Sequence, residues 1–227
     1  MLKNINYILT DIEGTTTSVS FVYDVLFPYF RNNIEKLRDL KLNPDVFEAF
    51  EQTIEIAALE GEDIKQTDEI LAKLLEWSLD DKKITPLKTL QGILWKDGYN
   101  SGEIKGHVYS DVAPTLHKWK EQHIKLGVFS SGSVAAQKLI FGYSVEGDLC
   151  PYFSDYFDTK TGGKREVETY KTIAAKVDCK PNEILFLSDI KEELEAAKSA
   201  GYQTIQLVRE GIKANWEKCV KDFSEIR

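Results

Sequence analysis

The chain has 227 residues, of which 42% are hydrophobic and 29% are charged, and its formal net charge is −8. This length is enough to bury a core in one large domain, or in one domain that carries a smaller insert. The acidic balance argues against nucleic acid and anionic membranes as partners, because no basic patch would offset the repulsion of phosphates. No apolar run approaches the roughly 18 residues that a membrane span needs, and no signal-peptide pattern opens the chain.

The three cysteines, Cys150, Cys179 and Cys219, are far apart and odd in number. Without a CxxC pair or a Cys/His cluster they predict neither a zinc site nor a disulfide framework. Unremarkable thiols of this kind are typical of a reducing compartment, so we expect a cytoplasmic protein. Nothing in the sequence asks for more than a monomer.

The first predicted element is a short buried strand over residues 5–9, which is too brief for a helix. Asp11 and Glu13 follow it, and Gly14 and three threonines come next. At the carboxyl end of a central strand, this pattern places a carboxylate in a crevice where backbone N–H groups and hydroxyls can bind an anion. The same residue types also form ordinary strand-to-turn transitions, so the rest of the chain has to decide between the two interpretations.

Residues 19–105 show helical periodicity and no convincing strand. Apolar stripes predict four helices, over residues 21–40, 44–61, 67–79 and 86–98. Pro28 should kink or split the first helix, and Thr67 is the expected N-cap of the third. This change of composition predicts a helical insert rather than a continuing α/β core.

From residue 106 onward, apolar strands alternate with amphipathic helices. The expected strands cover residues 124–129, 156–157, 184–187 and 204–208, and the expected helices cover residues 111–123, 135–140, 170–177 and 191–200. This alternation predicts an α/β fold, with a parallel, doubly wound sheet and helices on both of its faces. We therefore assign residues 1–18 and 106–227 to the core and residues 19–105 to the insert.

Polar groups follow four strands or loops of the predicted sheet, at the edge where such folds bind ligands. They are Asp11 with Glu13, Ser130 with Ser131, Lys164, and Asp189. Each group also has an ordinary explanation. Serines cap helices, most lysines are solvated, and Asp189 could cap a helix whose dipole favours Glu192 and Glu193. These explanations do not account for the joint arrangement.

The cleavage of a phosphate ester needs groups of these types. Magnesium prefers oxygen ligands and keeps several waters, so the carboxylates of Asp11 and Asp189 with one backbone carbonyl would suffice. The cation would let an anionic carboxylate approach an anionic phosphate. Glu13 could protonate the leaving oxygen and later deprotonate the attacking water, which divides one difficult step into two.

Two further groups could hold the phosphate itself. Ser130, with the backbone N–H groups of Ser131 and Gly132 at a helix start, can bind phosphate oxygens. Lys164 adds a positive point charge on the transferred group and can keep Asp11 ionised.

The order of these motifs, D-x-[DE]-G-T followed by a serine, a lysine and an aspartate, resembles the haloacid dehalogenase superfamily of aspartyl-phosphate phosphatases. The sequence is more similar still to one family within it, the enolase-phosphatases (acireductone synthases) of methionine salvage. The stretches that carry this likeness span nearly the whole chain: residues 11–16, 27–29, 90–92, 106–109, 130–134, 157–160 and 184–189. Glu13, where most of the superfamily has aspartate, is itself a mark of that family.

The resemblance implies a Rossmann-like core, a helical cap inserted after the first strand, one Mg²⁺ per subunit and a bifunctional reaction. The family enolises 2,3-diketo-5-methylthiopentyl 1-phosphate, a small-molecule phosphate ester, and then removes the phosphate through an aspartyl-phosphate to leave the acireductone. By this likeness Asp11 is nucleophile and metal ligand, Asp189 is a metal ligand, and Glu13 contributes a metal-ligating carbonyl and acid/base chemistry. The positions that would bind the substrate phosphate are Ser130, Ser131 and Lys164.

Other functions use part of the same residue set. A receiver-like signalling module combines an acid pair, a phosphoacceptor aspartate, a hydroxyl and a lysine, but it lacks this length and the helical insert. A phosphatase for another small phosphate ester would differ only in the insert. A dehalogenase needs no metal, and the carboxylates of Glu13 and Asp189 argue against it. A binding protein without activity is disfavoured because no expected catalytic residue is missing. His107, at the junction between insert and core, could contact the substrate or act as the enolisation base, but we favour a hydrogen-bonded structural histidine. We expect Trp77 and Trp95 to pack rather than to bind substrate.

Overall fold

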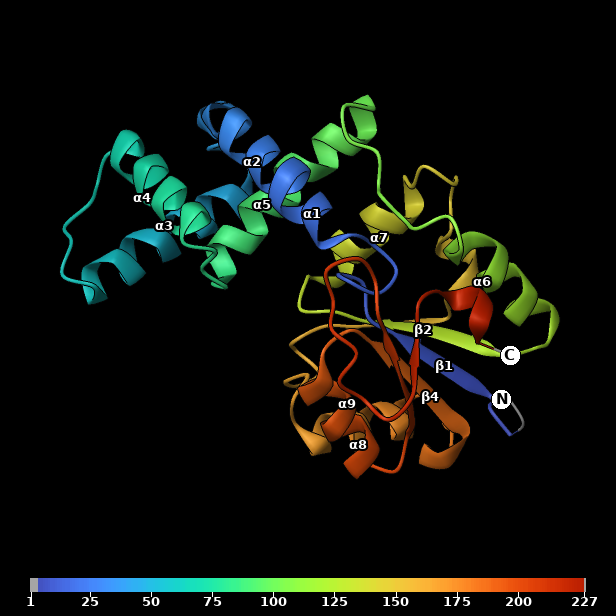
Figure 1. The fold of residues 1–227 in the computed structure, drawn as a ribbon. Coiled ribbons are helices and arrows are strands. Elements are labelled where there is room, and N and C mark those ends of the chain that lie inside the picture. Colours follow the sequence, from blue (N-terminus) through green and yellow to red (C-terminus); the bar gives the residue numbers. More distant parts are fainter. Residues whose placement is uncertain (1–3, 227) are drawn as a thin grey trace. The chain divides into compact units, whose positions relative to one another are not determined.

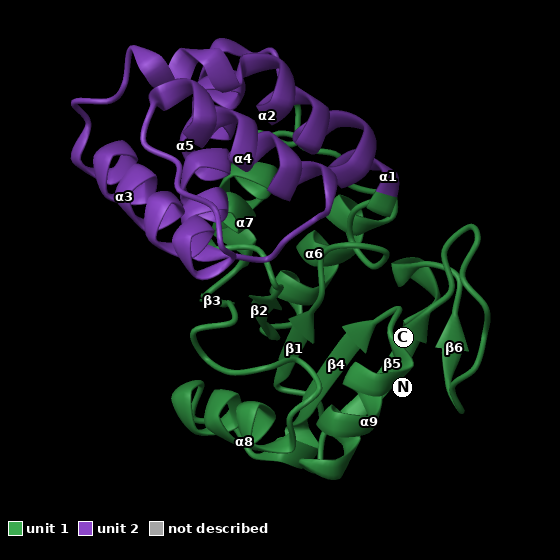
Figure 2. Cartoon of the chain, turned by 90° about the vertical axis from the view of Figure 1, so that its left-hand side faces the viewer, with its two compact units in different colours: residues 1–19, 105–227 green, residues 20–104 purple. Residues whose placement is uncertain are grey.

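The computed structural model describes residues 4–226, and the chain divides into two compact units (Figure 2). Unit 1 consists of Met1–Val19 and Lys105–Arg227, and unit 2 is Ser20–Ile104. Unit 2 is therefore an insert in the chain of unit 1. Its role as a cap stays a prediction.

Within residues 4–226, unit 1 contains a six-stranded sheet in the order β3-β2-β1-β4-β5-β6, and every neighbouring pair is parallel (Figure 1). The strands are β1 (Tyr7–Thr10), β2 (Lys125–Phe129), β3 (Asp155–Phe157), β4 (Ile184–Ser188), β5 (Gln203–Leu207) and β6 (Cys219–Val220). Every residue of β1 and β4 is buried, as expected where helices cover both faces of a parallel sheet. The predicted α/β fold is confirmed.

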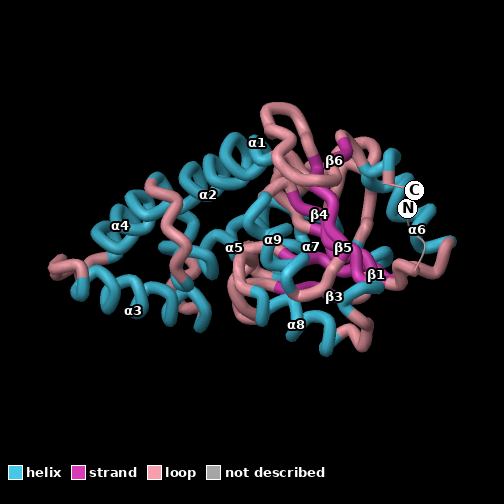
Figure 3. The backbone as a smooth tube through the Cα atoms, turned by 60° about the horizontal axis from the view of Figure 1, so that its bottom comes forward, coloured by secondary structure: helices cyan, strands magenta, loops and turns pink. Residues whose placement is uncertain are grey.

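Helices lie on both faces of this sheet (Figures 1 and 3). In unit 1 they are α6 (Val112–Glu121), α7 (Val134–Gly142), α8 (Val167–Lys176) and α9 (Lys191–Ser199). Side chains alternate along a strand, so Tyr7 and Leu9 of β1 share one face. Both belong to a core cluster with Tyr170 of α8 and Leu194 of α9. Figure 1 shows α6 and α7 on the opposite face, where they contact β2 and β3.

The strand order changes direction at β1. After the insert the chain continues to β2, which neighbours β1, and on to β3, and it then crosses back to β4 on the other side of β1. The N–H of Asp11 extends the pairing by donating to the Leu187 carbonyl of β4 at 2.9 Å. In open α/β sheets such a switch point forms a crevice at the carboxyl ends of the two strands. The residues after β1 and β4 therefore lie where a ligand would bind.

Two predictions from the sequence are wrong in detail. The strand expected last, at residues 204–208, corresponds to β5, and a further strand, β6, follows it. The sequence did not predict β6 because two residues are too few to show a periodicity. Thr67 is not an N-cap but the first residue of its helix. Gln66 is the N-cap, and Glu69 completes a capping box with it.

Every regular element from Ser20 to Ile104 is helical, as the sequence predicts. The elements are α1 (Val19–Phe21), the π-helix η1 (Val22–Leu26), α2 (Phe27–Asn33), the 3₁₀-helix η2 (Ile34–Arg38), α3 (Pro44–Leu59), α4 (Thr67–Leu79) and α5 (Thr85–Ser101). The expected split falls just before Pro28, which lies in the first turn of α2. Trp77 is fully buried, and the Trp95 indole donates to the Leu26 carbonyl at 2.8 Å, so both pack within unit 2. No helix in residues 4–226 is long and apolar enough to cross a membrane.

Gly127 of β2 lets Tyr7 lie across the neighbouring strand. A Cβ at Gly127 would meet the Tyr7 hydroxyl oxygen at 1.9 Å, and that hydroxyl donates to Asp155 Oδ2 at 3.0 Å. We expect Gly127→Ala to lower the free energy of unfolding by about 1–3 kcal/mol through overpacking. Gly92→Ala in α5 is the control, since its Cβ would meet nothing within 4 Å and alanine favours a helix. Thermal unfolding followed by circular dichroism measures both, and an undiminished midpoint for Gly127→Ala would contradict this packing.

Candidate active site

Asp11 is fixed at the end of β1 by bonds from its own neighbours. It is 4% exposed, and its Oδ1 accepts from the Ile12 N–H at 2.7 Å. The hydroxyl of Thr10 donates to the Asp11 carbonyl at 2.9 Å. Together with the bond from its own N–H to β4, these contacts give the carboxylate one orientation at the carboxyl edge of the sheet.

The turn after Asp11 is closed around a single carbonyl. The N–H groups of Thr15, Thr16 and Thr17 all donate to the Ile12 carbonyl, at 3.1, 2.9 and 2.9 Å. Gly14 has φ +73°, and a Cβ there would lie 2.4 Å from Asp189 Oδ2. Only glycine therefore permits both this backbone conformation and the close approach of the Asp189 carboxylate.

Lys164 joins two acids from different parts of the chain. Its Nζ lies 2.7 Å from Asp11 Oδ1 and 2.7 Å from Glu193 Oε2. Burial alone would lower the pKa of Lys164, but the charges of Asp11 and Glu193 outweigh it and raise that pKa above its ordinary value. The lysine is therefore a fixed positive charge in the site, and not one more solvated side chain.

Glu193 is a site residue that the sequence did not reveal. Its placement near the start of α9 had an adequate explanation in the helix dipole, yet its side chain is buried and its Oε2 also accepts from the Ser188 hydroxyl at 2.9 Å. Burial and the nearby charge of Asp11 raise the pKa of Glu193 to about 7. The available signal was periodicity, because Glu193 shares the buried stripe of α9 with Ala196 and Ala197, whereas Glu192 is exposed.

Asp189 follows β4 and faces the turn after β1. Burial first, and then the charge of Asp11, raise the pKa of Asp189 to about 7, and Glu13 adds to the shift. Its Oδ1 is buried and has no hydrogen-bond partner among the residues that the structure describes. An unpaired buried carboxylate oxygen is costly unless a cation or a proton binds there.

Ser130 and Ser131 follow β2, the other neighbour of β1. Ser130 is buried, and its Oγ accepts from the Gly132 N–H at 3.2 Å. Ser133, rather than either of them, caps α7 by accepting from the Ala136 N–H at 3.2 Å. Helix capping therefore does not explain Ser130 or Ser131. In this structure the Gly132 N–H, which the sequence suggested for phosphate, is engaged with Ser130.

The acids around Asp11 suit an oxygen-liganded cation. Across residues 4–226, no three acid, histidine or cysteine side chains converge so as to hold a metal ion by themselves. A set formed by two carboxylates, Asp11 and Asp189, and the backbone carbonyl of Glu13 needs only two such side chains. Oxygen donors with room for water are what Mg²⁺ prefers, and the unpaired Asp189 Oδ1 would gain a partner.

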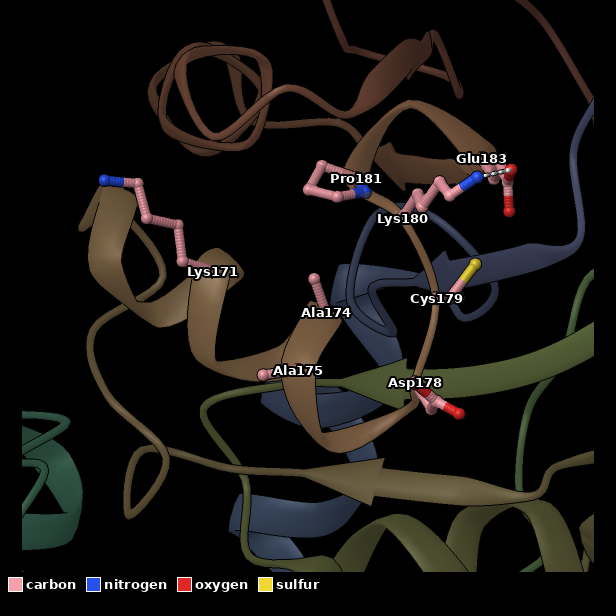
Figure 4. A pocket seen from close by; sticks show the side chains of 8 residues that line it. All are labelled: Lys171, Ala174, Ala175, Asp178, Cys179, Lys180, Pro181 and Glu183. Atoms are coloured by element: carbon pink, nitrogen blue, oxygen red, sulfur yellow. Dashed lines mark ion pairs between the residues drawn. The ribbon is translucent and has the colours of Figure 1, made fainter.

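A hollow of about 470 Å³ lies at the amino-terminal edge of the sheet, between the end of α8 and the start of β4 (Figure 4). Figure 4 shows Lys180 paired with Glu183, at 3.7 Å, and Lys171 extending away from them. The rest of the lining includes Ala174 and Cys179. The charged side chains of this lining do not converge, so it is a weaker candidate site than the carboxyl edge.

Comparisons with known proteins identify the family of this chain. A family model described as a haloacid dehalogenase-like hydrolase matches residues 5–201. The chain is 51% identical to the enolase-phosphatase E1 of a Picosynechococcus species over 98% of both chains. It is 48% identical to that of Marinobacter nauticus, over 98% of this chain and 96% of the relative.

The chain belongs to the enolase-phosphatase E1 family of haloacid dehalogenase-like hydrolases. The resemblance drawn from the motifs is confirmed, and the protein is an enzyme of the phosphatase type. Among solved structures, the UTR4 protein of Saccharomyces cerevisiae is 34% identical, with a TM-score of 0.80 over 97% of this chain and 99% of that one. CbbY from Rhodobacter sphaeroides, solved with phosphate, has a TM-score of 0.59 and 18% identity over 98% of this chain and 96% of that one, and it shares the fold alone.

In this member of the enolase-phosphatase E1 family, the unpaired oxygen of Asp189 should lower the stability of the metal-free protein and should favour the binding of a cation. We expect Asp189→Asn to stabilise the metal-free protein by about 2 kcal/mol at pH 8, because the amide removes a buried charge. The folded-state pKa of Asp189, about 7, lies above the ordinary value, so its ionisation weakens the fold as the pH rises from about 4 to 7.

Chemical unfolding of the metal-free proteins at pH 5 and pH 8 measures this effect. The gain from Asp189→Asn should shrink at pH 5, where Asp189 is protonated. Added Mg²⁺ should stabilise the unmodified protein and not the variant. A variant that is less stable than the unmodified protein at pH 8 without metal would refute the assignment of an uncompensated carboxylate.

Proposed function

We propose that this protein is a magnesium-dependent enolase-phosphatase of methionine salvage. It converts 2,3-diketo-5-methylthiopentyl 1-phosphate to the acireductone 1,2-dihydroxy-3-keto-5-methylthiopentene and phosphate. The observation that carries the proposal is the cluster at the ends of β1 and β4, where Lys164 lies 2.7 Å from Asp11 beside the unpaired oxygen of Asp189. Relatives named for this activity align with 98% of the chain.

Asp11 is the nucleophile in this proposal. Its Oδ1 is occupied by the Ile12 N–H and by Lys164, so the carboxylate cannot rotate freely and Oδ2 attacks phosphorus. The Lys164 ammonium keeps Asp11 ionised because an adjacent positive charge favours the carboxylate form. As the bond between Oδ2 and phosphorus forms, the bond between phosphorus and the ester oxygen breaks.

Glu13 acts on the leaving group and then on water. It gives a proton to the departing ester oxygen, and as a carboxylate it then takes a proton from the water that hydrolyses the aspartyl-phosphate. Asp11, Asp189 and the Glu13 carbonyl would hold Mg²⁺. The bound ion would neutralise the repulsion between the carboxylate and the phosphate.

Ser130, Ser131 and Lys164 bind the transferred phosphate. The position of Ser130 and Ser131 after β2, next to β1, supports this role, and Lys164 supplies the positive charge. Glu193 keeps Lys164 in place through its own 2.7 Å ion pair. The helical unit 2 serves as the cap that selects the substrate, and we expect a cytoplasmic monomer.

Asp11→Asn tests the nucleophile. We expect it to lower phosphate release by roughly 10³-fold or more, because an amide cannot form the acyl-phosphate. The measurement is phosphate release from the diketone phosphate and from a panel of small phosphate esters, each with and without Mg²⁺. Asp63→Asn is the matched control, since Asp63 is exposed in unit 2. Turnover by Asp11→Asn equal to that of the control would overturn the proposal.

Glu13→Asp separates the two chemical steps. Aspartate is one methylene shorter, which moves the carboxyl by roughly 1.5 Å. We expect enolisation and phosphate release to slow by different factors, because the longer side chain suits both sites of proton transfer. Absorbance of the enol and release of phosphate, recorded in one reaction, report the two steps. Equal factors for both steps would sink this account of Glu13.

A further inference from the structure

Arg209, just after β5, uses all its hydrogen-bond donors inside unit 1. It is 7% exposed. Its Nε and Nη2 donate to the Thr15 carbonyl at 3.1 and 2.9 Å, and its two Nη atoms donate to the two carboxylate oxygens of Asp111, each at 2.8 Å. Nη1 also donates to the Lys221 carbonyl at 3.4 Å. These contacts use the five N–H groups of the guanidinium.

The Thr15 carbonyl belongs to the catalytic turn, which we call the threonine loop (residues 14–17). The same loop is tied at the next two positions. The Tyr109 N–H donates to the Thr16 carbonyl at 3.0 Å, and the Thr17 hydroxyl donates to the His107 carbonyl at 2.8 Å. The guanidinium carbon of Arg209 lies 4.1 Å from the centre of the Tyr109 ring. Arg209 and the 107–111 segment thus hold one side of the loop together.

The other side of the threonine loop carries the reactive groups. Glu13 immediately precedes the loop and pairs with Thr17 through its backbone. The Gly14 N–H donates to the Thr17 carbonyl at 2.8 Å, and Gly14 lies against the Asp189 carboxylate. With three further N–H groups on the Ile12 carbonyl, the loop is a closed hydrogen-bonded ring. A displacement at Thr15 is therefore transmitted to Glu13 rather than absorbed.

We infer that Arg209 is a positioning residue for the proton transfer that Glu13 performs in the proposed function. Two N–H groups of Arg209 bind the Thr15 carbonyl, and the bidentate bond to Asp111 holds the guanidinium in place. These contacts fix the position of the threonine loop, and with it the position of the Glu13 carboxyl. Lysine cannot reproduce this arrangement, because an ammonium lacks the planar fork. Asp111 in turn accepts from the Phe223 N–H at 2.8 Å. This bond ties the Arg209–Asp111 pair, which we call the clamp, to the segment that begins at Phe223.

The test follows how strongly hydrolysis depends on the leaving group. p-Nitrophenolate departs without a proton, whereas an alkoxide needs one from the general acid. Values of kcat/KM for p-nitrophenyl phosphate and for a series of alkyl phosphates give a ratio in which the fraction of folded enzyme cancels. For Arg209→Lys we expect the alkyl-to-aryl ratio to fall at least about tenfold, in the direction of Glu13→Gln, the reference variant without the acid.

Two further variants make the result decisive. Asp111→Asn keeps Arg209 but weakens its fork, and it should move the ratio in the same direction by a smaller factor. Arg38→Lys, the same substitution at a surface ion pair of unit 2, should leave the ratio unchanged. If both rates fall equally in Arg209→Lys and Asp111→Asn, the clamp only stabilises the fold and the inference is overturned. If the unmodified enzyme cleaves no phosphate ester, the proposed function fails and this inference fails with it.

Discussion

The arrangement around Lys164 depends on an excess of negative charge. One ammonium lies between Asp11 and Glu193, while the Asp189 carboxylate approaches the same region and Glu13 adds its charge to it. Burial first, and then the charge of Asp11, raise the pKa values of Asp189 and Glu193 to about 7, and the single positive charge of Lys164 opposes this shift only in part. A second cation bound here would lower the repulsion that an anionic phosphate meets. An oxygen-liganded cation bound near Asp11 and Asp189 would offset this excess of negative charge.

The topology of the sheet brings these charges together. Asp11 and Asp189 are far apart in the sequence, yet β1 and β4 are neighbours, and the parallel pairing puts both carboxyl ends at one edge. The register aligns Thr10 with Leu187, so each aspartate follows within two residues of that pair. The core cluster on the face covered by α8 and α9 packs against both β1 and β4. Core packing therefore holds the carboxylates of Asp11 and Asp189 near each other despite their electrostatic repulsion.

The sequence was sufficient for the groups that follow strands and insufficient for those that act across elements. Asp11 and Asp189 could be placed because apolar runs mark buried strands and parallel strands share an edge. Glu193 looked like an ordinary acid at a helix start, since its partners Lys164 and Ser188 come from other elements. Arg209 carried no local signal, because its main acceptors, Thr15 and Asp111, are distant in sequence. The strand-end groups are set by local pattern, whereas their supports are set by long-range contacts.

The threonine loop lies close to the point where the chain leaves unit 1, and Arg209 is one of the residues that anchor it. The chain must leave unit 1 at Val19, only a few residues after Asp11, and it returns at Lys105. A loop so close to the exit would pass any strain from the insert to Asp11 and Glu13 unless it were anchored first. The bonds at Thr15, Thr16 and Thr17 supply that anchor from Arg209 and from the returning segment. This anchor is built from backbone groups and the Arg209–Asp111 ion pair, and it does not use the carboxylates of Asp11 and Glu13.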